Sequence, residues 1–202
     1  SAAGKSSLAR LLVGVWQPTR GKVRLDGAAL DQWDEEALGR HIGYLPQESS
    51  VFRRLSVEEN ILAILEMMPL SQQERSGRAE LLLKELDLTH LRSSKAYALS
   101  GGERRRLEIT RALVTGPKLL LLDEPFNGVD PIAVYAVQQI IRKLKQKGIG
   151  ILLTDHHVRE ALRVVDRAYI IHHGKVLREG TSEFLVNDPK SREIYLGPEF
   201  SM

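Results

Sequence analysis

Cysteine is absent from this chain of 202 residues, and no long hydrophobic run occurs in it. Without cysteine, the chain can form neither a disulfide framework nor a cysteine-ligated zinc site, which is compatible with the cytosol. No apolar run approaches the roughly 18 residues that a membrane-spanning helix needs, and the first residues do not resemble a secretory signal. We therefore expect no direct membrane insertion, so that any role at a membrane would depend on a partner protein.

The chain also has little excess of charge of either sign. Its formal net charge is +3, and basic and acidic residues are interspersed instead of being gathered along one stripe. This pattern favours a solvated surface and argues against nucleic acid as a partner. The length suits one domain with a sizeable core, or a domain with a small additional lobe.

Short apolar runs that alternate with helical patterns indicate an α/β fold with a mostly parallel sheet. The runs at 118–125 and 148–155 are typical of strands buried on both faces. Other short strands are expected at 21–27, at 41–47 and, as a pair turning at Gly174, at 167–180. Helices are expected at 4–16, 131–147 and 157–165. The stretch 56–114 is helical in pattern and interrupts the alternation, which indicates a separate helical lobe.

The chain opens with SAAGKSS, in which Gly4-Lys5-Ser6 matches the end of the phosphate-binding loop G-x-x-x-x-G-K-[ST]. The first glycine of that motif would stand two positions before residue 1. In such a loop backbone N–H groups face phosphates, the lysine reaches the β- and γ-phosphates, and the Ser6 hydroxyl binds Mg²⁺. A chance Gly-Lys-Ser at a helix start explains the tripeptide equally well. The residues expected at the phosphates are Ala3, Gly4, Lys5, Ser6 and Ser7.

An acidic pair, Asp123-Glu124, ends the apolar run LLLLDEP. Ligands of α/β sheets bind at the carboxyl ends of the strands. There Asp123 would hold Mg²⁺, and Glu124 would orient and polarise the water that attacks the γ-phosphate. The alternative is an N-cap pair that begins the next helix.

The segment Leu99-Ser-Gly-Gly-Glu103 stands at the start of a predicted helix. Ser100, Gly101 and Gly102 would expose N–H donors at the positive end of the helix dipole, which makes a second anion site. The alternative is a plain helix cap, and we expect the arginines at 104–106 to form a solvated face. Since one nucleotide has little use for two phosphate sites in one chain, two chains placed head to tail would each complete the site of the other.

These motifs, taken with Gln47, Gly128-Val-Asp130 and Thr154-Asp-His156 in this order, resemble the ATP-binding domain of ATP-binding cassette (ABC) transporters over nearly the whole chain. The resemblance implies a P-loop NTPase fold of ABC type with a helical signature subdomain. It also implies ATP and Mg²⁺ as cofactors, and ATP hydrolysis coupled to transport. In such a domain, residues 1–49 and 115–202 would form the core lobe and 50–114 the helical lobe.

The resemblance assigns further roles to single residues. Gln47 would contact Mg²⁺ or water and face the membrane partner, and Asp130 would communicate across the dimer. His156 would contact the γ-phosphate, and Ser100, Gly101, Gly102 and Glu103 would face the ATP of the other chain. On composition alone His156 would be a surface or capping residue, but its place just after the strand at 148–155 favours the functional role. Three further histidines, His157, His172 and His173, match no motif and are expected to be structural.

From about residue 42 onward the resemblance is to the ATPase of lipopolysaccharide-export transporters of Gram-negative bacteria. Phe52-Arg-Arg-Leu-Ser56 is its most distinctive stretch. This implies a homodimeric subunit on the cytoplasmic side of the inner membrane, which receives integral membrane subunits in a groove near Gln47–Ser56. Residues 1–41 instead resemble the ATP-binding domain of type I secretion exporters. We therefore hypothesise a hybrid joined near 42–47, the alternative being a divergent natural sequence.

Three other functions remain open from the sequence. They are the ATPase domain of a type I protein-secretion exporter, a soluble ABC ATPase outside transport, and a non-catalytic scaffold. The second would call for a coiled-coil insertion or a second cassette, and neither pattern is seen. The family has strands before the phosphate loop that the 202 residues do not include, so we expect this chain alone to bind ATP weakly and to hydrolyse it poorly.

Overall fold

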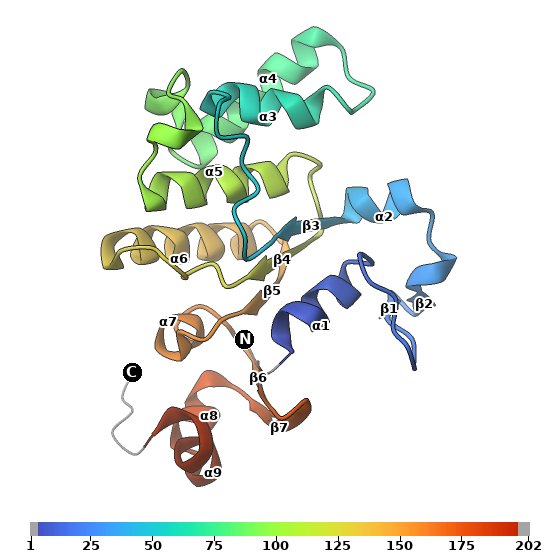
Figure 1. Ribbon diagram of the computed structural model, residues 1–202, viewed down its shortest axis with the longest axis vertical. Helices are drawn as coiled ribbons and strands as arrows, with labels where there is room; N and C mark the ends of the chain where they lie inside the picture. Colours follow the sequence, from blue (N-terminus) through green and yellow to red (C-terminus); the bar gives the residue numbers. More distant parts are fainter. Residues whose placement is uncertain (1–3, 198–202) are drawn as a thin grey trace.

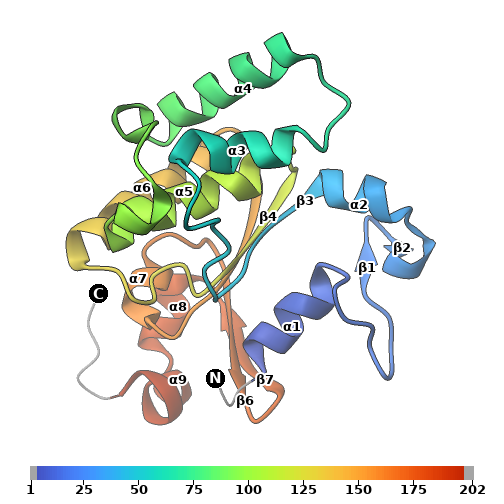
Figure 2. The ribbon, with the colours of Figure 1, turned by 45° about the horizontal axis from the view of Figure 1, so that its top comes forward.

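The computed structural model describes residues 4–197, and only the backbone of Tyr195. Its centre is a parallel sheet of three strands in the order β3 (Ile42–Leu45), β4 (Leu119–Asp123), β5 (Gly150–Thr154). Helix α1 (Lys5–Leu12) covers one face, and α5 (Gly101–Leu113) and α6 (Pro131–Gln146) cover the other (Figure 2). Because β4 lies in the middle, Leu120, Leu121 and Leu122 are buried, as the apolar run predicts, while Leu119 at its start is partly exposed.

The strand register brings the chemistry-bearing segments to one edge of the sheet. Leu45 pairs with Leu122, and Asp123 pairs with Thr154, so the three strands end side by side. The residues that follow them are Gln47, Glu124 and His156. The predicted strands at 41–47, 118–125 and 148–155 are thus confirmed, and their carboxyl ends share one edge. The expected burial of 148–155 on both faces is wrong, because β5 lies outermost in the described sheet and Leu152 is 36% exposed.

The predicted helical block lies above the sheet in Figure 1. It contains α3 (Val57–Leu65), α4 (Gln72–Glu85), the short 3₁₀ turns Thr89–Leu91 and Ala96–Ala98, and then α5. Each of the three α-helices begins with a Ser-x-x-Glu capping box, formed by Ser56 with Glu59, Ser71 with Glu74, and Ser100 with Glu103. The apolar residues of this block and of β3 and β4 form one continuous core.

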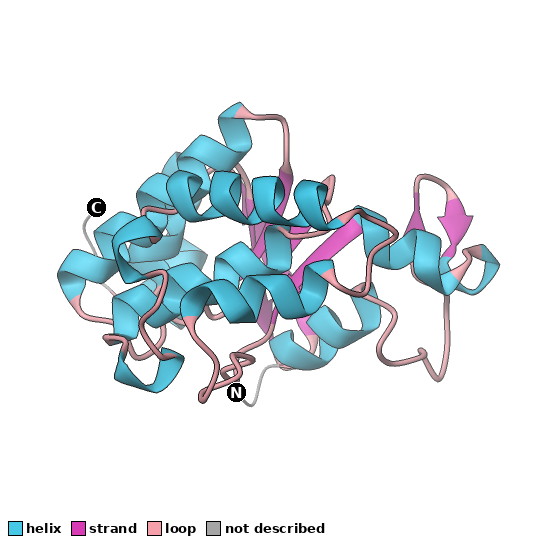
Figure 3. Cartoon of the chain, turned by 90° about the horizontal axis from the view of Figure 1, so that it is seen from above, coloured by secondary structure: helices cyan, strands magenta, loops and turns pink. Residues whose placement is uncertain are grey.

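The first forty residues differ from the expectation. Helix α1 stops at Leu12 because Gly14 adopts a left-handed φ of 78°, the conformation that ends helices. Of the strand predicted at 21–27, only Arg24–Leu25 forms a strand, and its partner strand was not predicted. Asp26 and Gly27, both at positive φ, turn the chain between β1 (Arg24–Leu25) and β2 (Ala28–Ala29), a small hairpin at the far end of the molecule in Figure 3. The turn Leu30–Gln32 and α2 (Glu35–His41) follow it.

The chain after β5 forms a smaller layer below the sheet in Figure 1. Helix α7 (Val158–Leu162) leads to the antiparallel strands β6 (Ala168–His172) and β7 (Lys175–Gly180), which turn at His173-Gly174 as predicted. Two short helices, α8 (Ser182–Asn187) and α9 (Pro189–Ser191), and the helical turn Arg192–Leu196 complete the described chain. Within residues 4–197, the helices are too short or too polar to cross a bilayer.

Candidate functional site

The start of α1 contacts the segment that follows β5. Gly4 takes a left-handed φ of 75° just before the helix, and the Lys5 ammonium donates a hydrogen bond to the Asp155 carbonyl over 3.0 Å. Ala3, expected beside the phosphates, lies outside the described residues, and Ser7 is exposed on the first turn of α1. Two motifs far apart in the sequence therefore meet at this edge of the sheet.

Gln47 lies between the first motif and the acidic pair. Its Oε1 is 3.4 Å from the Ser6 hydroxyl, and its Nε2 donates to Glu124 Oε2 over 2.9 Å. A primary amide can make both contacts because it carries an acceptor and two donors. One exposed side chain thus spans the gap between residues that the sequence analysis assigned to Mg²⁺ and to the attacking water.

Glu124 is buried, with 2% of its surface exposed, and its backbone is in the left-handed region at φ 51°. Besides Gln47, two side-chain nitrogens lie near its Oε2: His156 Nδ1 at 3.3 Å and Asn127 Nδ2 at 3.4 Å. Side-chain nitrogens from three loops therefore converge on one carboxylate oxygen. Asn127 was not among the predicted residues, since its approach follows from the tight turn after Glu124 and not from a motif.

The alternative reading of Asp123-Glu124 as an N-cap pair is wrong. The next helix, α6, begins only at Pro131, and its cap is Asp130, whose carboxylate accepts from the N–H groups of Ile132 and Ala133 at 3.0 Å each. Asp123 is 1% exposed, and one of its oxygens accepts a hydrogen bond from the Thr154 hydroxyl. The pair ends a strand, as the catalytic reading requires.

The donor set fits Mg²⁺, a hard cation that takes oxygen ligands in octahedral geometry. Neighbouring ligands in such a shell lie about 3 Å apart, given metal–oxygen distances of about 2.1 Å. Ser6 Oγ and Gln47 Oε1, at 3.4 Å, are close to this spacing. Asp123 adds a carboxylate at the end of the neighbouring strand. The residues predicted for the metal are thus chemically suited to it.

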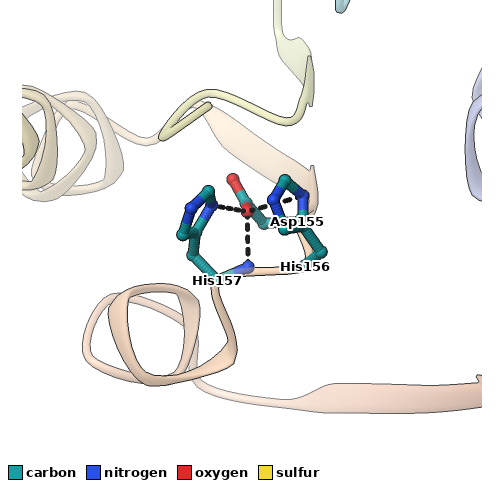
Figure 4. A group of neighbouring side chains, drawn as sticks. All are labelled: Asp155, His156 and His157. Atoms are coloured by element: carbon teal, nitrogen blue, oxygen red, sulfur yellow. Dashed lines mark hydrogen bonds and ion pairs between the residues drawn. The ribbon is translucent and has the colours of Figure 1, made fainter. Parts of the chain in front are cut away.

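Asp155 clamps the segment that carries His156 (Figure 4). Its buried carboxylate accepts from the backbone N–H and the Nδ1 of His157 at 2.7 and 2.9 Å, and from the Phe126 N–H at 3.1 Å. The His156 side chain, 47% exposed, lies on the other side of the carboxylate. Asp155, His156 and His157 could together hold a metal ion, but both carboxylate oxygens already accept hydrogen bonds. The group is better explained as a structural clamp, in keeping with the structural role expected for His157.

The signature segment 100–103 forms a helix cap as well as an exposed helix start. Ser100 Oγ accepts from the Glu103 N–H at 3.3 Å, and Glu103 Oε2 accepts from the Ser100 N–H at 2.8 Å. The second of these bonds is the main reason why the pKa of Glu103 lies below its usual value. Gly102 is required by packing, because a Cβ there would come within 2.5 Å of the Ala133 Cβ in α6.

Within one chain the signature segment lies beside the Gly128-Val-Asp130 motif, but not beside the phosphate-loop residues at the start of α1. A Cβ on Gly101 would lie 3.3 Å from the Gly128 carbonyl, so the start of α5 adjoins the loop that ends at Asp130. In Figures 1 and 2 this pair of helix starts lies apart from the start of α1. The structure therefore brings together Lys5, Ser6, Gln47, Glu124 and His156, but leaves Ser100, Gly101, Gly102, Glu103 and Asp130 in a second group.

The arginines at 104–106 do not form a common solvated face, and for Arg105 that expectation is wrong. Arg105 is 5% exposed, while Arg106 reaches outward to the exposed Asp87 at 3.2 Å. Successive helix residues point about 100° apart, so three in a row cannot share one face. The Arg105 guanidinium instead lies under the turn that contains Glu124, and it donates to the carbonyls of Glu124 and Pro125.

An exposed aromatic ring with rigid support follows Gln47 in the loop after β3. Phe52 is 50% exposed, and the Arg111 guanidinium lies 4.5 Å from the centre of its ring. The fully buried Asn60 fixes the loop, since its side chain bonds both the N–H and the carbonyl of Phe52, at 2.8 and 3.0 Å, and the Ser56 carbonyl at 2.9 Å. Burial lowers the pKa of Arg111. Asn60 and Arg111, which the sequence analysis did not single out, make this part of the predicted groove a firm surface.

The family model and the related proteins that match this chain all point to the same family. A protein-family model described as "ABC transporter" matches residues 1–127. The lipopolysaccharide export system ATP-binding protein LptB of Acidithiobacillus ferridurans is 50% identical over 100% of this chain and 84% of its own length. The LptB of Haemophilus influenzae is 46% identical over 100% and 85%. A probable ABC transporter ATP-binding protein of Azorhizobium caulinodans is 48% identical over 100% and 72%. These alignments include residues 1–41 as well as the remainder.

Solved structures agree with the sequence relatives. CbiO1 of Clostridium perfringens, described as part of an ABC transporter complex, superposes with a TM-score of 0.83 at 26% identity, covering 91% of this chain and 74% of that one. A dimeric ATP-binding cassette in a post-hydrolysis state, bound to ADP and Pi, gives a TM-score of 0.77 at 28% identity, covering 89% and 81%.

Proposed function

The chain belongs to the ABC transporter family, and from that premise we propose that it is the ATP-binding and ATP-hydrolysing subunit that powers lipopolysaccharide export from the inner membrane. The observation that carries the ATPase part is the convergence on Glu124. Gln47 and His156, which follow the two neighbouring strands, both lie within 3.3 Å of its Oε2, and Gln47 connects it to Ser6. Four motifs separated along the chain thus meet around one buried carboxylate.

The proposed roles follow from this arrangement. Lys5 and the first turn of α1 bind the phosphates of ATP, and Ser6, Gln47 and Asp123 hold Mg²⁺. The metal, when bound, supplies positive charge that offsets the negative charge on the phosphates. Glu124 orients and polarises the attacking water, and His156 contacts the γ-phosphate. Gln47 contacts both the metal and Glu124.

We propose that the working unit is a head-to-tail homodimer. The start of α5 lies away from the start of α1 in one chain (Figure 1), and the signature segment 100–103 at the start of α5 opens with the exposed Ser100 and Gly101. A second copy would bring the N–H groups of Gly101 and Gly102 and the positive end of the α5 dipole to the γ-phosphate side of the nucleotide. Asp130, beside the same helix start, would then lie at the dimer contact. In this assembly residues 1–49 and 115–202 form the nucleotide lobe, and 50–114 form the helical lobe.

The export part rests on the relatives and on the surface near Gln47. Proteins named as lipopolysaccharide export system ATP-binding proteins align over the whole chain at 44–50% identity. Phe52, on a rigid loop, provides a partly exposed ring, and Arg111 of α5 provides a cation beside it, which suits a helix of an integral membrane subunit. The protein would then be peripheral, on the cytoplasmic side of the inner membrane.

The whole-chain alignment supports this function over a type I secretion ATPase. The hybrid hypothesis stays a proposal, tested by comparing 1–41 and 42–202 separately with ABC sequences. Co-purification of the full-length protein with the membrane subunits of lipopolysaccharide export, and not with secretion components, would support the export role. The reverse outcome would overturn it.

Glu124→Gln tests the ATPase mechanism. In the full-length protein we expect hydrolysis to fall by roughly 10²-fold or more, while ATP binding persists and a closed dimer accumulates in size-exclusion chromatography with Mg·ATP. Glu48→Gln, at the exposed position next to Gln47, is the matched control and should hydrolyse ATP normally. Normal turnover by Glu124→Gln would contradict the role of Glu124.

A further inference from the structure

One ion pair in the helical block is almost fully buried. Arg105 Nη1 and Glu108 Oε2, both on α5, lie 2.8 Å apart, and their side chains are only 6% and 5% exposed. Removing two charges from water is costly unless further hydrogen bonds satisfy both groups. The partners that satisfy them come from two other segments of the chain.

Arg105 binds the backbone of the turn that holds Glu124. Its Nε donates to the Pro125 carbonyl over 2.9 Å, and its Nη2 donates to the Glu124 carbonyl. Glu124 has a φ of 51°, a region that L-residues with long side chains rarely occupy. Such a conformation persists only where the surroundings hold it. The hydrogen bonds from the Arg105 guanidinium to these two successive carbonyls stabilise the left-handed conformation of Glu124.

Glu108 binds the loop after β3. Its second oxygen, Oε1, accepts a hydrogen bond from the Ser49 hydroxyl over 2.6 Å. Ser49 stands two residues after Gln47, whose amide bonds the Glu124 carboxylate. The contacts therefore close a ring: from Gln47 along the backbone to Ser49, through Glu108 and Arg105 to the Glu124 backbone, and through the Glu124 side chain back to Gln47.

We propose that Arg105 and Glu108 are positioning residues that keep the backbone of Glu124 in its left-handed conformation. Because Glu108 also bonds Ser49, the position of the 47–49 loop then affects the position of Glu124. The inference rests on the proposed ATPase function. The same loop leads to the surface of Phe52 and Arg111, and Arg111 itself donates to the Ser50 carbonyl. A partner that moves the loop would displace Glu108 and Arg105, and the shift of Arg105 would change the position of the Glu124 backbone.

Ser49→Ala tests the outermost link without disturbing the core, because Ser49 is exposed. In the full-length protein assembled with its membrane subunits, we expect kcat for ATP to fall about tenfold, as for the loss of a hydrogen bond to a charged group. The KM for ATP and the urea unfolding midpoint should stay unchanged. Ser50→Ala, the neighbouring exposed serine, is the matched control and should leave kcat unchanged.

A double-mutant cycle tests whether Ser49 and Glu108 act as one unit. Glu108→Gln removes the charge opposite Arg105, and we expect Ser49→Ala to lower kcat little further in that background. Additive effects, or a loss confined to the urea midpoint, would overturn the proposal. So would normal kcat in both single variants while Glu124→Gln is inactive. If Glu124→Gln itself turns over normally, the proposed function fails, and this inference fails with it.

Discussion

The amide nitrogen of Gln47 lies 2.9 Å from Oε2 of Glu124, and the amide oxygen of the same side chain faces the Ser6 hydroxyl. Gln47 follows β3 and Glu124 follows the neighbouring β4, so the contact exists because parallel pairing ends the two strands together. The neutral amide can donate to the carboxylate, whereas an acidic side chain of the same length would repel it. The role of this contact can therefore be tested by introducing a negative charge at position 47.

Gln47→Glu should move the acid side of the pH–rate profile to higher pH. A second carboxyl would then face the Glu124 carboxylate, and like charges at this distance cause one of the two groups to keep its proton to higher pH. We expect kcat/KM at pH 7 to fall by about tenfold or more and to recover partly as the pH rises. Gln47→Ala is the control, since it removes the contact without adding charge. If kcat/KM fell at the same pH on the acid side of both variants' pH–rate profiles, the prediction would be contradicted.

His156 and His157 should differ sharply in their effect on hydrolysis. His156 Nδ1 lies 3.3 Å from Glu124 Oε2, whereas His157 Nδ1 bonds Asp155. His156→Asn should lower kcat by roughly 10²-fold. His157→Asn, the matched neighbour, should leave kcat close to that of the unaltered protein. Steady-state ATPase assays of the two variants test this prediction. Equal losses of kcat would mean that the 155–157 segment affects hydrolysis only through its structure.

Acid should weaken the capping box at the start of α4. Hydrogen bonds from the hydroxyl and the N–H of Ser71 lower the pKa of Glu74 below its usual value of 4.5. A carboxyl with a lowered pKa in the folded state stabilises the protein above its unfolded pKa, and that stabilisation disappears as the pH falls through the folded one.

Glu74→Ala should therefore reduce the free energy of unfolding at pH 7, and the difference from the unaltered protein should shrink as the pH is lowered from about 5 to 3. Urea unfolding across this range is the measurement. Glu66→Ala, at an exposed position before the same turn, is the control. A difference that stays constant with pH would contradict the assignment.

Much of the site follows from local sequence patterns. The runs 118–125 and 148–155 predict buried strands because both faces are apolar, and the residues after such strands meet at one edge of the sheet. The contacts of Asp155 and Arg105 could not be predicted in this way. Each depends on which loop lies against which, and that is decided by the packing of α5 and the register of β4 with β5.

Two errors near the N-terminus have local causes. The alternation at 21–27 indicated one strand, but β1 occupies only Arg24–Leu25 of it, because Asp26-Gly27 already forms a two-residue hairpin turn to β2. Helix α2 was missed because EEALGRH has too few apolar positions to show a helical period, although Asp34 caps it by accepting from the Ala37 N–H. For short elements, turn and cap residues are therefore better guides than hydrophobic spacing.

Two glycine-to-alanine changes should act in opposite directions. In Gly102→Ala the new Cβ would lie 2.5 Å from that of Ala133, so α5 and α6 must separate, and we expect a loss of about 1–3 kcal/mol in the free energy of unfolding. In Gly77→Ala, inside α4, the new Cβ meets nothing within 4 Å. That change should stabilise the protein by roughly 0.5–1 kcal/mol, because alanine loses less backbone entropy in a helix. Urea unfolding of both variants measures the two effects. If Gly102→Ala were as stable as Gly77→Ala, packing against Ala133 would not explain why glycine stands at position 102. Exposure of the helix N-terminus would then be the remaining explanation.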